Sequence, residues 1–281
     1  MKRLSAAAII VLLPCSVTHA QSGPPNPARP NLSSPYHSKL ASKVIVITGA
    51  SSGLGKQLAL MSAQAGAKVI LVSDEKDPLR TLNHQINANG GYSEFVHCDI
   101  RSRKQVATAA TYIRERFKRI DILINNAGVW TDDNLEKVNP QKRNEAFSVN
   151  ALGNIQFNEA VLPMFQRQNA GHIFNVLSTS ALPDLKEGTN TKWKSYGASK
   201  WAFAGYTKAL RESLAYTNIK VTEFLPGGFD SKLYERVGRP QPHSQPWMMK
   251  VEDVAEVAMF VLSRPDDVLI PRIVVTKVQH R

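Results

Sequence analysis

Short apolar runs alternate with longer amphipathic stretches along the chain from residue 43 onward. The run 44–47 consists of Val and Ile alone, which is typical of a parallel strand that is buried on both faces. The same reading predicts the remaining elements: strands over 68–72, 95–98, 120–124, 172–177, 221–225 and 272–275, and helices over 56–65, 78–88, 104–117, 140–165, 195–215 and 251–262. Strands that alternate with helices of this length predict an α/β fold, with a doubly wound, mostly parallel seven-stranded sheet and helices on both faces.

The first 41 residues follow a different pattern. A positive start is followed by an uncharged apolar run over 4–13, and residues 18–20 place small side chains where a signal peptidase reads them. We therefore predict a signal peptide over 1–20, since the apolar run is shorter than the ~20 residues that span a bilayer. Residues 21–41 are rich in Pro, Ser and Asn and predict a flexible linker, which leaves a single domain over 42–281.

Cleavage of this signal would place the protein in the periplasm, outside the cell or in the ER lumen. It would also leave no stable membrane span. An uncleaved signal would tether the protein to a membrane, and a misassigned start codon would leave it in the cytoplasm.

Composition narrows the choice of partners. The 281 residues carry a net charge of +12, which is typical of proteins that bind nucleic acids or anionic surfaces. Four of the basic residues precede residue 42, and no basic run with interleaved aromatic residues follows, so we expect no nucleic-acid partner. Only Cys98 remains after the predicted signal, which excludes an internal disulfide, and the scattered histidines predict no metal site.

A glycine-rich segment, Thr-Gly-Ala-Ser-Ser-Gly-Leu-Gly over 48–55, follows the first predicted strand and precedes a helix. Glycines at this spacing allow a sharp turn and let a pyrophosphate approach the backbone. The helix then directs its N-terminal N–H groups and the positive end of its dipole toward the phosphates. The sequence therefore predicts a dinucleotide site at this turn.

Further motifs occur in a fixed order after the glycines. They are Asn125-Asn126-Ala127-Gly128 after the fourth strand, Asn150 in the next helix, Ser178 after the fifth strand, Tyr196-Gly-Ala-Ser-Lys200, and Pro226-Gly227 after the sixth strand. With the glycine-rich segment, they resemble the short-chain dehydrogenases/reductases over about residues 42–276. The resemblance implies a Rossmann-type domain, an NAD(P)-dependent enzyme acting on CH–OH groups, and a homo-oligomer, either dimer or tetramer.

The Tyr-X-X-X-Lys pattern is weak evidence by itself, because a second copy runs from Tyr216 to Lys220. That copy lies at the end of its predicted helix, whereas Tyr196 and Lys200 lie near the start of theirs, one turn apart on the same side. The order of the motifs, rather than any one of them, carries the resemblance.

The resemblance also implies roles for these side chains. A carbonyl oxygen that gains negative charge needs a proton, which the phenol of Tyr196 can supply. A free phenol has a pKa near ~10, and the Lys200 ammonium one helical turn away would lower that pKa while holding the cofactor ribose. Ser178 would donate a hydrogen bond to the substrate oxygen, with Thr179 and Ser180 as rivals beside it. Asn150 would hold a water that links Lys200 to solvent.

The choice between NAD and NADP depends on the end of the second strand. Asp74 would accept a hydrogen bond from the ribose 2′-hydroxyl of NAD, and no basic residue precedes Gly53, so NAD is favoured. Lys56 and Lys76 are close enough to reach a phosphate, which keeps NADP open. Asp99 resembles the residue that hydrogen-bonds the adenine. The predicted cofactor contacts are Gly49, Ser51, Ser52, Gly53, Leu54, Gly55, Asp74, Asp99, Asn126, Ala127, Gly128, Tyr196, Lys200, Pro226, Gly227 and Ser231.

The substrate side is less specified. Residues 228–250 contain aromatic and Met side chains among polar ones and correspond to the mobile lid of the family, which suggests an apolar or lipid-like substrate. The alternative is that they pack on the domain or on an oligomer interface. Residues 182–193 form a longer connection than is usual and would reshape the rim of the pocket.

The leading prediction is hydride transfer between NAD(P)(H) and a small-molecule alcohol or carbonyl. The alternative is an exported nucleotide-binding protein of the same fold with little or no catalysis, because soluble nicotinamide cofactors are scarce outside the cytoplasm.

Overall fold

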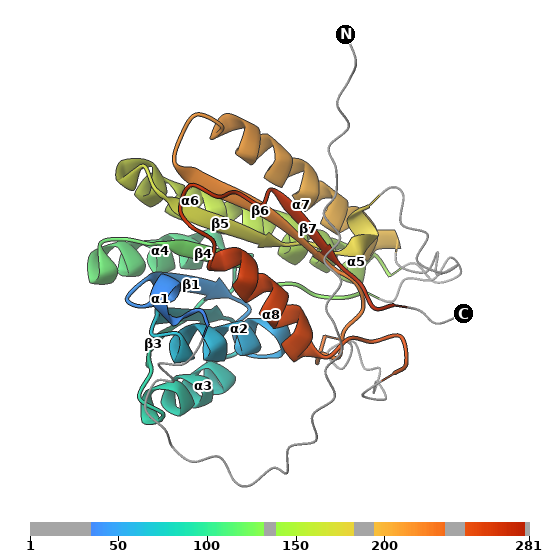
Figure 1. The fold of residues 1–281 in the computed structure, drawn as a ribbon. Helices are drawn as coiled ribbons and strands as arrows, with labels where there is room; N and C mark the ends of the chain where they lie inside the picture. Colours follow the sequence, from blue (N-terminus) through green and yellow to red (C-terminus); the bar gives the residue numbers. More distant parts are fainter. Residues whose placement is uncertain (1–34, 132–138, 183–193, 234–244, 279–281) are drawn as a thin grey trace, which may run out of the picture.

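The computed structural model of the protein describes residues 35–131, 139–182, 194–233 and 245–278 (Figure 1). The predicted signal peptide and most of the predicted linker lie outside the described residues. The last part of the linker region folds onto the domain: it contains the short helix α1 (His37–Leu40), in which Leu40 is buried, and Tyr36 packs on the same core cluster. The chain thus joins the domain before residue 42, because Leu40 provides an apolar contact inside an otherwise polar segment.

The described strands form one sheet in the order β3-β2-β1-β4-β5-β6-β7, and each neighbouring pair is parallel. Their bounds are β1 (Val44–Thr48), β2 (Lys68–Ser73), β3 (Tyr92–His97), β4 (Ile122–Asn125), β5 (Gly171–Val176), β6 (Ile219–Pro226) and β7 (Arg272–Val275). The predicted seven-stranded doubly wound sheet is confirmed. From β1 the chain adds β2 and β3 toward one edge of the sheet, and it then adds β4 to β7 toward the other edge. In such sheets ligands bind at the carboxyl ends of the strands beside this switch in strand order, which lies between β1 and β4.

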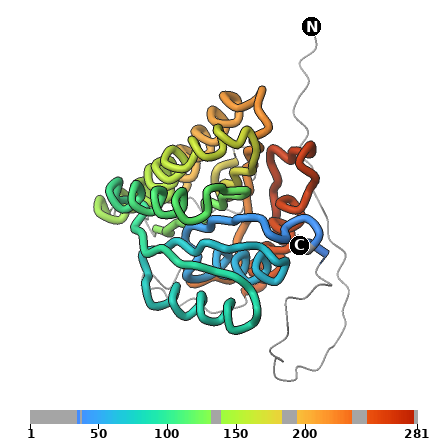
Figure 2. Tube along the Cα trace, turned by 90° about the vertical axis from the view of Figure 1, so that its left-hand side faces the viewer, coloured from blue at the N-terminus to red at the C-terminus, as the bar shows by residue number. Residues whose placement is uncertain are grey.

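Helices cover both faces of the sheet (Figures 1 and 2). One face carries α1, α2 (Gly53–Gln64), α3 (Lys76–Ala88) and α8 (Val251–Leu262), and the other carries α4 (Arg103–Phe117), α6 (Asn154–Gln168) and α7 (Lys194–Ser213). The helix α5 (Pro140–Phe147) precedes α6 and contacts α7. Because the sheet is sandwiched, every residue of β1 is buried, as its all-apolar run predicts.

The predicted continuous helix over 140–165 is wrong in one respect. A π-helical turn, Ser148–Gly153, separates α5 from α6. Close packing surrounds this turn: a Cβ on Gly153 would lie 2.8 Å from Cγ1 of Ile100. Single π-turns within helices occur frequently at functional sites. This one contains Asn150, so the irregularity falls where the sequence predicts chemistry.

The third strand also differs from prediction. It begins at Tyr92 rather than at residue 95, and it is the edge strand of the sheet beside β2. Its first half is Tyr-Ser-Glu, which lacks the apolar run of the buried strands. An edge strand needs fewer apolar residues because one of its sides faces solvent, so its start carries little sequence signal.

Candidate active site

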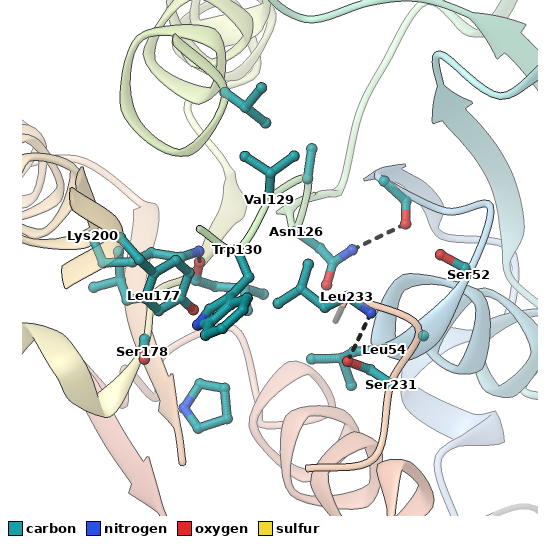
Figure 3. Close-up of a pocket in the computed structure, with 18 of the residues that line it drawn as sticks. Ser52, Leu54, Asn126, Val129, Trp130, Leu177, Ser178, Lys200, Ser231 and Leu233 are labelled. Atoms are coloured by element: carbon teal, nitrogen blue, oxygen red, sulfur yellow. Dashed lines mark hydrogen bonds between the residues drawn. The ribbon is translucent and has the colours of Figure 1, made fainter. Parts of the chain in front are cut away.

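A pocket of about 250 Å³ opens at the carboxyl ends of the strands, beside the switch in strand order between β1 and β4 (Figure 3). Most of the predicted site residues line it: Gly49, Ser52, Gly53, Leu54, Asp74, Asp99, Asn126, Ala127, Gly128, Ser178, Tyr196, Lys200, Pro226, Gly227 and Ser231. Ser51, Gly55 and Asn150 do not line the pocket and instead contact the residues that do. The sheet therefore brings together residues as far apart in sequence as Gly49 and Ser231, as expected for this topology.

The glycine-rich turn is held close to the loop that follows β4. Gly49 has φ +63°, and a Cβ there would lie 2.8 Å from Cα of Ala127. A Cβ on Gly55 would lie 2.3 Å from the carbonyl oxygen of Gly49. These positions therefore accept only glycine, which keeps the turn packed against the loop after β4 and places Gly49 and Gly53 on the pocket wall at the start of α2.

Hydrogen bonds join the two loops directly. The hydroxyl oxygen of Thr48 accepts from the backbone N–H groups of Asn126 at 3.0 Å and Ala127 at 3.1 Å. The side-chain amide of Asn126 donates to the carbonyls of Thr48 and Gly49, both at 3.1 Å, which Figure 3 shows in part. The end of β1 and the loop after β4 are thus joined by four hydrogen bonds.

Tyr196 and Lys200 lie in the first part of α7 with their side chains adjacent. The Nζ atom of Lys200 is 5.9 Å from the centroid of the Tyr196 ring. Lys200 is 4% exposed, and its Nζ donates to the carbonyl oxygen of Val176 at 3.0 Å. Burial lowers the pKa of Lys200 to about 8. This lysine is therefore an ammonium that can lose its proton near physiological pH.

Ser178 is placed by the end of β5. Its hydroxyl oxygen accepts from the backbone N–H of Ser180 at 3.1 Å, at the start of a short 3₁₀ turn over Thr179–Ala181. Accepting this bond orients the hydroxyl and leaves its hydrogen to donate toward the pocket. Of the two rivals considered from the sequence, Thr179 also lines the pocket, whereas Ser180 does not.

Asn150 lies behind the pocket and is fully buried. Its Oδ1 accepts from the backbone N–H of Val129 at 2.8 Å, and its Nδ2 donates to the carbonyl of Val129 at 2.9 Å. The same Nδ2 donates to the hydroxyl of Ser199 at 3.0 Å, and that hydroxyl donates to the carbonyl of Tyr196 at 2.7 Å. The side chain thus joins the loop after β4 to α7, which the sequence reasoning did not anticipate.

The comparisons with known proteins agree with this geometry. Residues 43–242 match the family model described as short chain dehydrogenase, which is most of the chain. The protein belongs to the short-chain dehydrogenase family. It is thus an NAD(P)-dependent oxidoreductase, as the motif order predicts.

Curated relatives are similar over nearly their whole length. An uncharacterized oxidoreductase of Staphylococcus saprophyticus is 30% identical over 245 residues, covering 85% of this chain and 99% of the relative. An uncharacterized oxidoreductase of Listeria monocytogenes is 29% identical over 238 residues, covering 82% and 94%.

Solved structures show the same fold. An alcohol dehydrogenase of Thermococcus sibiricus, in complex with 5-hydroxy-NADP, has a TM-score of 0.77 at 24% identity, covering 85% of this chain and 98% of that one. A short-chain dehydrogenase/reductase of Burkholderia phymatum, in complex with NAD, has a TM-score of 0.73 at 25% identity, covering 84% and 89%.

In this short-chain dehydrogenase, the far end of the pocket is occupied by charged side chains. Asp99 accepts from the guanidinium of Arg101 at 2.8–3.0 Å, and these bonds hold the pKa of Asp99 below its usual range. Arg101 also lies 3.8 Å from Glu145, and both line the pocket. Sequence reasoning missed Arg101 and Glu145, although an Asp-X-Arg spacing, in which the Arg101 N–H also donates to Asp99, is a local signal.

Ser51 turns away from the pocket. Its hydroxyl donates to Oε2 of Glu75 at 2.5 Å and accepts from the hydroxyl of Ser73 at 3.1 Å. Glu75 occupies the N-cap position of α3, directly after Asp74, and its side chain makes no capping hydrogen bond. Two carboxylates therefore lie at the end of β2, with one of them bonded to the glycine-rich turn.

An apolar cluster flanks Tyr196. It consists of Trp130, Tyr196 and Met248, with Leu233 packed against it. In Figure 3 the indole of Trp130 points into the pocket, with Ser178, Lys200 and Leu233 drawn around it. Trp130 was also missed from the sequence, because its place two residues beyond Gly128 has no motif of its own.

The predicted lid is described only at its two ends. Phe229 pairs with Met249 in an isolated parallel bridge, and the ring of Trp247 packs so closely on Gly228 that a Cβ there would lie 2.4 Å from it. Residues 234–244 of the lid, and 183–193 of the long connection before Tyr196, lie outside the described residues.

The described ranges contain no group of three or more His, Cys, Asp or Glu side chains that could hold a metal ion. They also contain no helix that is both long and apolar enough to cross a membrane.

Proposed function

We propose that this short-chain dehydrogenase transfers a hydride between NAD(H) and the carbon of an apolar alcohol or ketone. The observation that carries the proposal is the placement of Ser178, Tyr196 and Lys200 around the same pocket as the glycine-rich turn. The apolar cluster with Trp130 supports an apolar substrate. The nicotinamide cofactor, when bound, supplies or accepts the hydride.

The residues of the pocket fit a dinucleotide. Gly49, Gly53 and Leu54 line the pocket where α2 begins, and they form a cradle at the N-terminal N–H groups of that helix. Asn126 and its neighbours form the facing wall. We assign the pyrophosphate to the cradle and the ribose beside the nicotinamide to Lys200.

The proton passes through Tyr196. In reduction, its phenol donates to the oxygen that gains charge, while the hydroxyl of Ser178 donates a hydrogen bond to the same oxygen. In oxidation, the Tyr196 phenolate accepts the proton, and the nearby Lys200 ammonium stabilises that phenolate. Because the pKa of Lys200 is lowered to about 8, this assistance is complete below that pH and is lost above it.

The chemistry is tested by Tyr196→Phe, with Tyr216→Phe as the matched control from the second Tyr-X-X-X-Lys copy, since Tyr216 is fully exposed. Turnover of apolar secondary alcohols and ketones, followed by nicotinamide absorbance, should fall by at least ~100-fold in Tyr196→Phe, as for removal of a general acid. NADH binding, followed by fluorescence, should stay unchanged in both variants. A Tyr196→Phe enzyme with normal turnover would remove the assignment.

We further propose that NAD is preferred over NADP. The 2′-phosphate of NADP would lie near Asp74 and Glu75, and like charges at short range repel. The hydroxyl of Ser51, in the glycine-rich turn, already donates to Glu75. The solved relatives bind either cofactor, so the preference depends on this chain's own residues.

Titration with both cofactors tests this preference. The protein should bind NAD⁺ at least ~10-fold more tightly than NADP⁺, a difference of about 1.4 kcal/mol. Glu75→Gln should narrow the ratio of the two dissociation constants. Asp77→Asn should not change it, because Asp77 lies two residues further along the chain and is exposed in the first turn of α3. Equal affinity of the unmodified protein for both cofactors would contradict the proposal.

Export and assembly remain proposals of the same kind. We propose that residues 1–20 direct export and that the catalytic domain extends to residue 281; the N-terminal residue of natively expressed protein tests the first point.

Leu152 and Trp201 are 58% and 46% exposed on adjoining segments, which supports the proposal that a homo-oligomer buries them. Light scattering of the purified protein measures that state directly.

A further inference from the structure

Asn154, the first residue of α6, connects the loop after β4 to the π-helical turn. It is 1% exposed. Its Nδ2 donates to the carbonyl of Ala127 at 3.0 Å, to that of Val149 at 3.0 Å and to that of Asn150 at 3.3 Å. An amide nitrogen has two hydrogens, so one hydrogen serves a single carbonyl and the other is shared between two.

Two of these bonds reach carbonyls inside the π-helical turn. A π-turn interrupts the regular i to i−4 ladder, and Val149 and Asn150 belong to that turn. A side-chain donor that bonds to these carbonyls stabilises this irregular stretch of backbone. The Asn154 side chain therefore supports the geometry that presents Asn150.

The bond to Ala127 reaches a different part of the site. Ala127 lines the pocket, and its own N–H donates to the hydroxyl of Thr48 at the end of β1. The peptide unit after Ala127 is thus held by Asn154, and the one before it by Thr48. Two residues further on, Val129 is held by the side chain of Asn150.

We propose that Asn154 is a positioning residue for cofactor binding. It holds the loop that lines the pocket, residues 126–129, at a fixed distance from the turn that carries Asn150. The side chain of Asn150 is in turn bonded to Ser199 in α7, the helix that carries Tyr196 and Lys200. Loss of its amide lets the loop and the turn move apart, so that the pocket wall is no longer preorganised. This inference rests on the proposed function, because it assigns the dinucleotide to this pocket.

The chain offers a matched control on the same helix. Asn158 lies one turn further along α6 and is fully buried. Its Oδ1 accepts from the side chain of Asn125 in β4 at 2.9 Å, and no described contact joins its side chain to the pocket loop. The two asparagines thus have the same size, helix and burial, and they differ in whether they hold the loop.

The experiment compares Asn154→Thr with Asn158→Thr. Threonine has nearly the volume of asparagine, and its hydroxyl can return to a carbonyl of its own helix, so both variants lose the remote contact with little cavity. NADH affinity is measured by fluorescence titration, and thermal unfolding is measured in parallel. If Asn154→Thr shows no unfolding transition, Asn154→Ser replaces it, since serine carries the same hydroxyl on a smaller side chain.

We expect the NADH dissociation constant to rise by about tenfold in Asn154→Thr and by less than about twofold in Asn158→Thr, since one to two hydrogen bonds are lost at the pocket wall only in the first. Both variants should lose similar stability. Unchanged NADH affinity in Asn154→Thr, or equal weakening in both variants, would overturn the inference while leaving the proposed function intact. If the unmodified protein binds neither NADH nor NADPH, the proposed function fails and this inference fails with it.

Discussion

Lys200 and Glu223 are both charged side chains buried beside the central sheet, but their surroundings differ. Glu223, in β6, is 0% exposed, and its two carboxylate oxygens pair with Arg211 at 2.8 Å and Arg272 at 2.5 Å. Lys200 is 4% exposed, and among the described residues its Nζ bonds only to the carbonyl of Val176. Its burial is thus compensated by a neutral partner.

The difference separates a structural charge from a chemical one. Glu223 has two counter-charges, Arg211 of α7 and Arg272 of β7, so it ties these two elements to β6. The pKa of Lys200 falls from 10.5 to about 8, which corresponds to about 3 kcal/mol of unfavourable burial. A buried ammonium that is retained at this cost indicates that its charge is used, and perturbed groups concentrate at functional sites.

The largest effect on turnover is expected in Lys200→Met. Removing the ammonium takes away the group that stabilises the Tyr196 phenolate, so turnover should fall by about 100- to 1,000-fold. The free energy of unfolding should stay the same or rise, because an apolar side chain of similar length no longer bears the cost of burying a charge. Turnover assays and urea denaturation of the same preparation measure both. A variant that keeps its turnover but loses stability would make Lys200 structural.

Glu223→Gln should show the opposite pattern. It leaves two guanidiniums without their carboxylate, and we expect a loss of about 2–3 kcal/mol of unfolding free energy, reduced from the fully buried value because Arg272 is about half exposed. NADH affinity should not change, because Glu223 lies away from the pocket. Urea denaturation and the NADH titration test this pair of outcomes. Weakened NADH binding at an unchanged free energy of unfolding would contradict the structural role of Glu223.

His172 extends the comparison to a buried group that is kept neutral. It is 4% exposed in β5, its Nε2 lies 2.8 Å from the hydroxyl of Thr222, and burial lowers its pKa to about 3. The unfolded state, with a pKa near ~6.5, takes up a proton that the folded state refuses, so stability is full above pH 6.5 and falls as the pH drops toward 3. At pH 5 the loss should be about 2 kcal/mol. Denaturation at pH 7 and pH 5 in the unmodified protein and in His172→Gln measures it; an equal pH dependence in both would assign the loss to other groups.

Much of the fold could be predicted from the sequence, because buried strands and amphipathic helices are local patterns. The bounds of α8 and β7 agree with prediction, and β1 differs by one residue. The start of β3 could not be predicted, since an edge strand tolerates polar residues. The π-turn over Ser148–Gly153 also has no signal within its own segment, because Asn154, one residue beyond it, and Ile100, remote in sequence, contact it.

The site was predictable to the extent that motifs mark it. Tyr196, Lys200 and Ser178 line one pocket, as their positions after particular strands and helices suggest. Trp130, Arg101 and Asn154 were missed because their importance comes from what lies across the fold. One signal was present for Asn154: two asparagines four residues apart in a helix that otherwise reads as amphipathic and apolar toward the sheet, which indicates buried amides with remote partners.

The pKa of Lys200 is the quantity on which the account depends most. It can be measured by NMR on protein labelled with ¹³C at lysine Cε, with the resonance assigned by its absence in Lys200→Met. Our account predicts that this resonance titrates near pH 8. A midpoint at the ordinary lysine value of ~10.4 would contradict it, because the burial of the Lys200 ammonium would then carry no cost and the contrast with the paired charge of Glu223 would disappear.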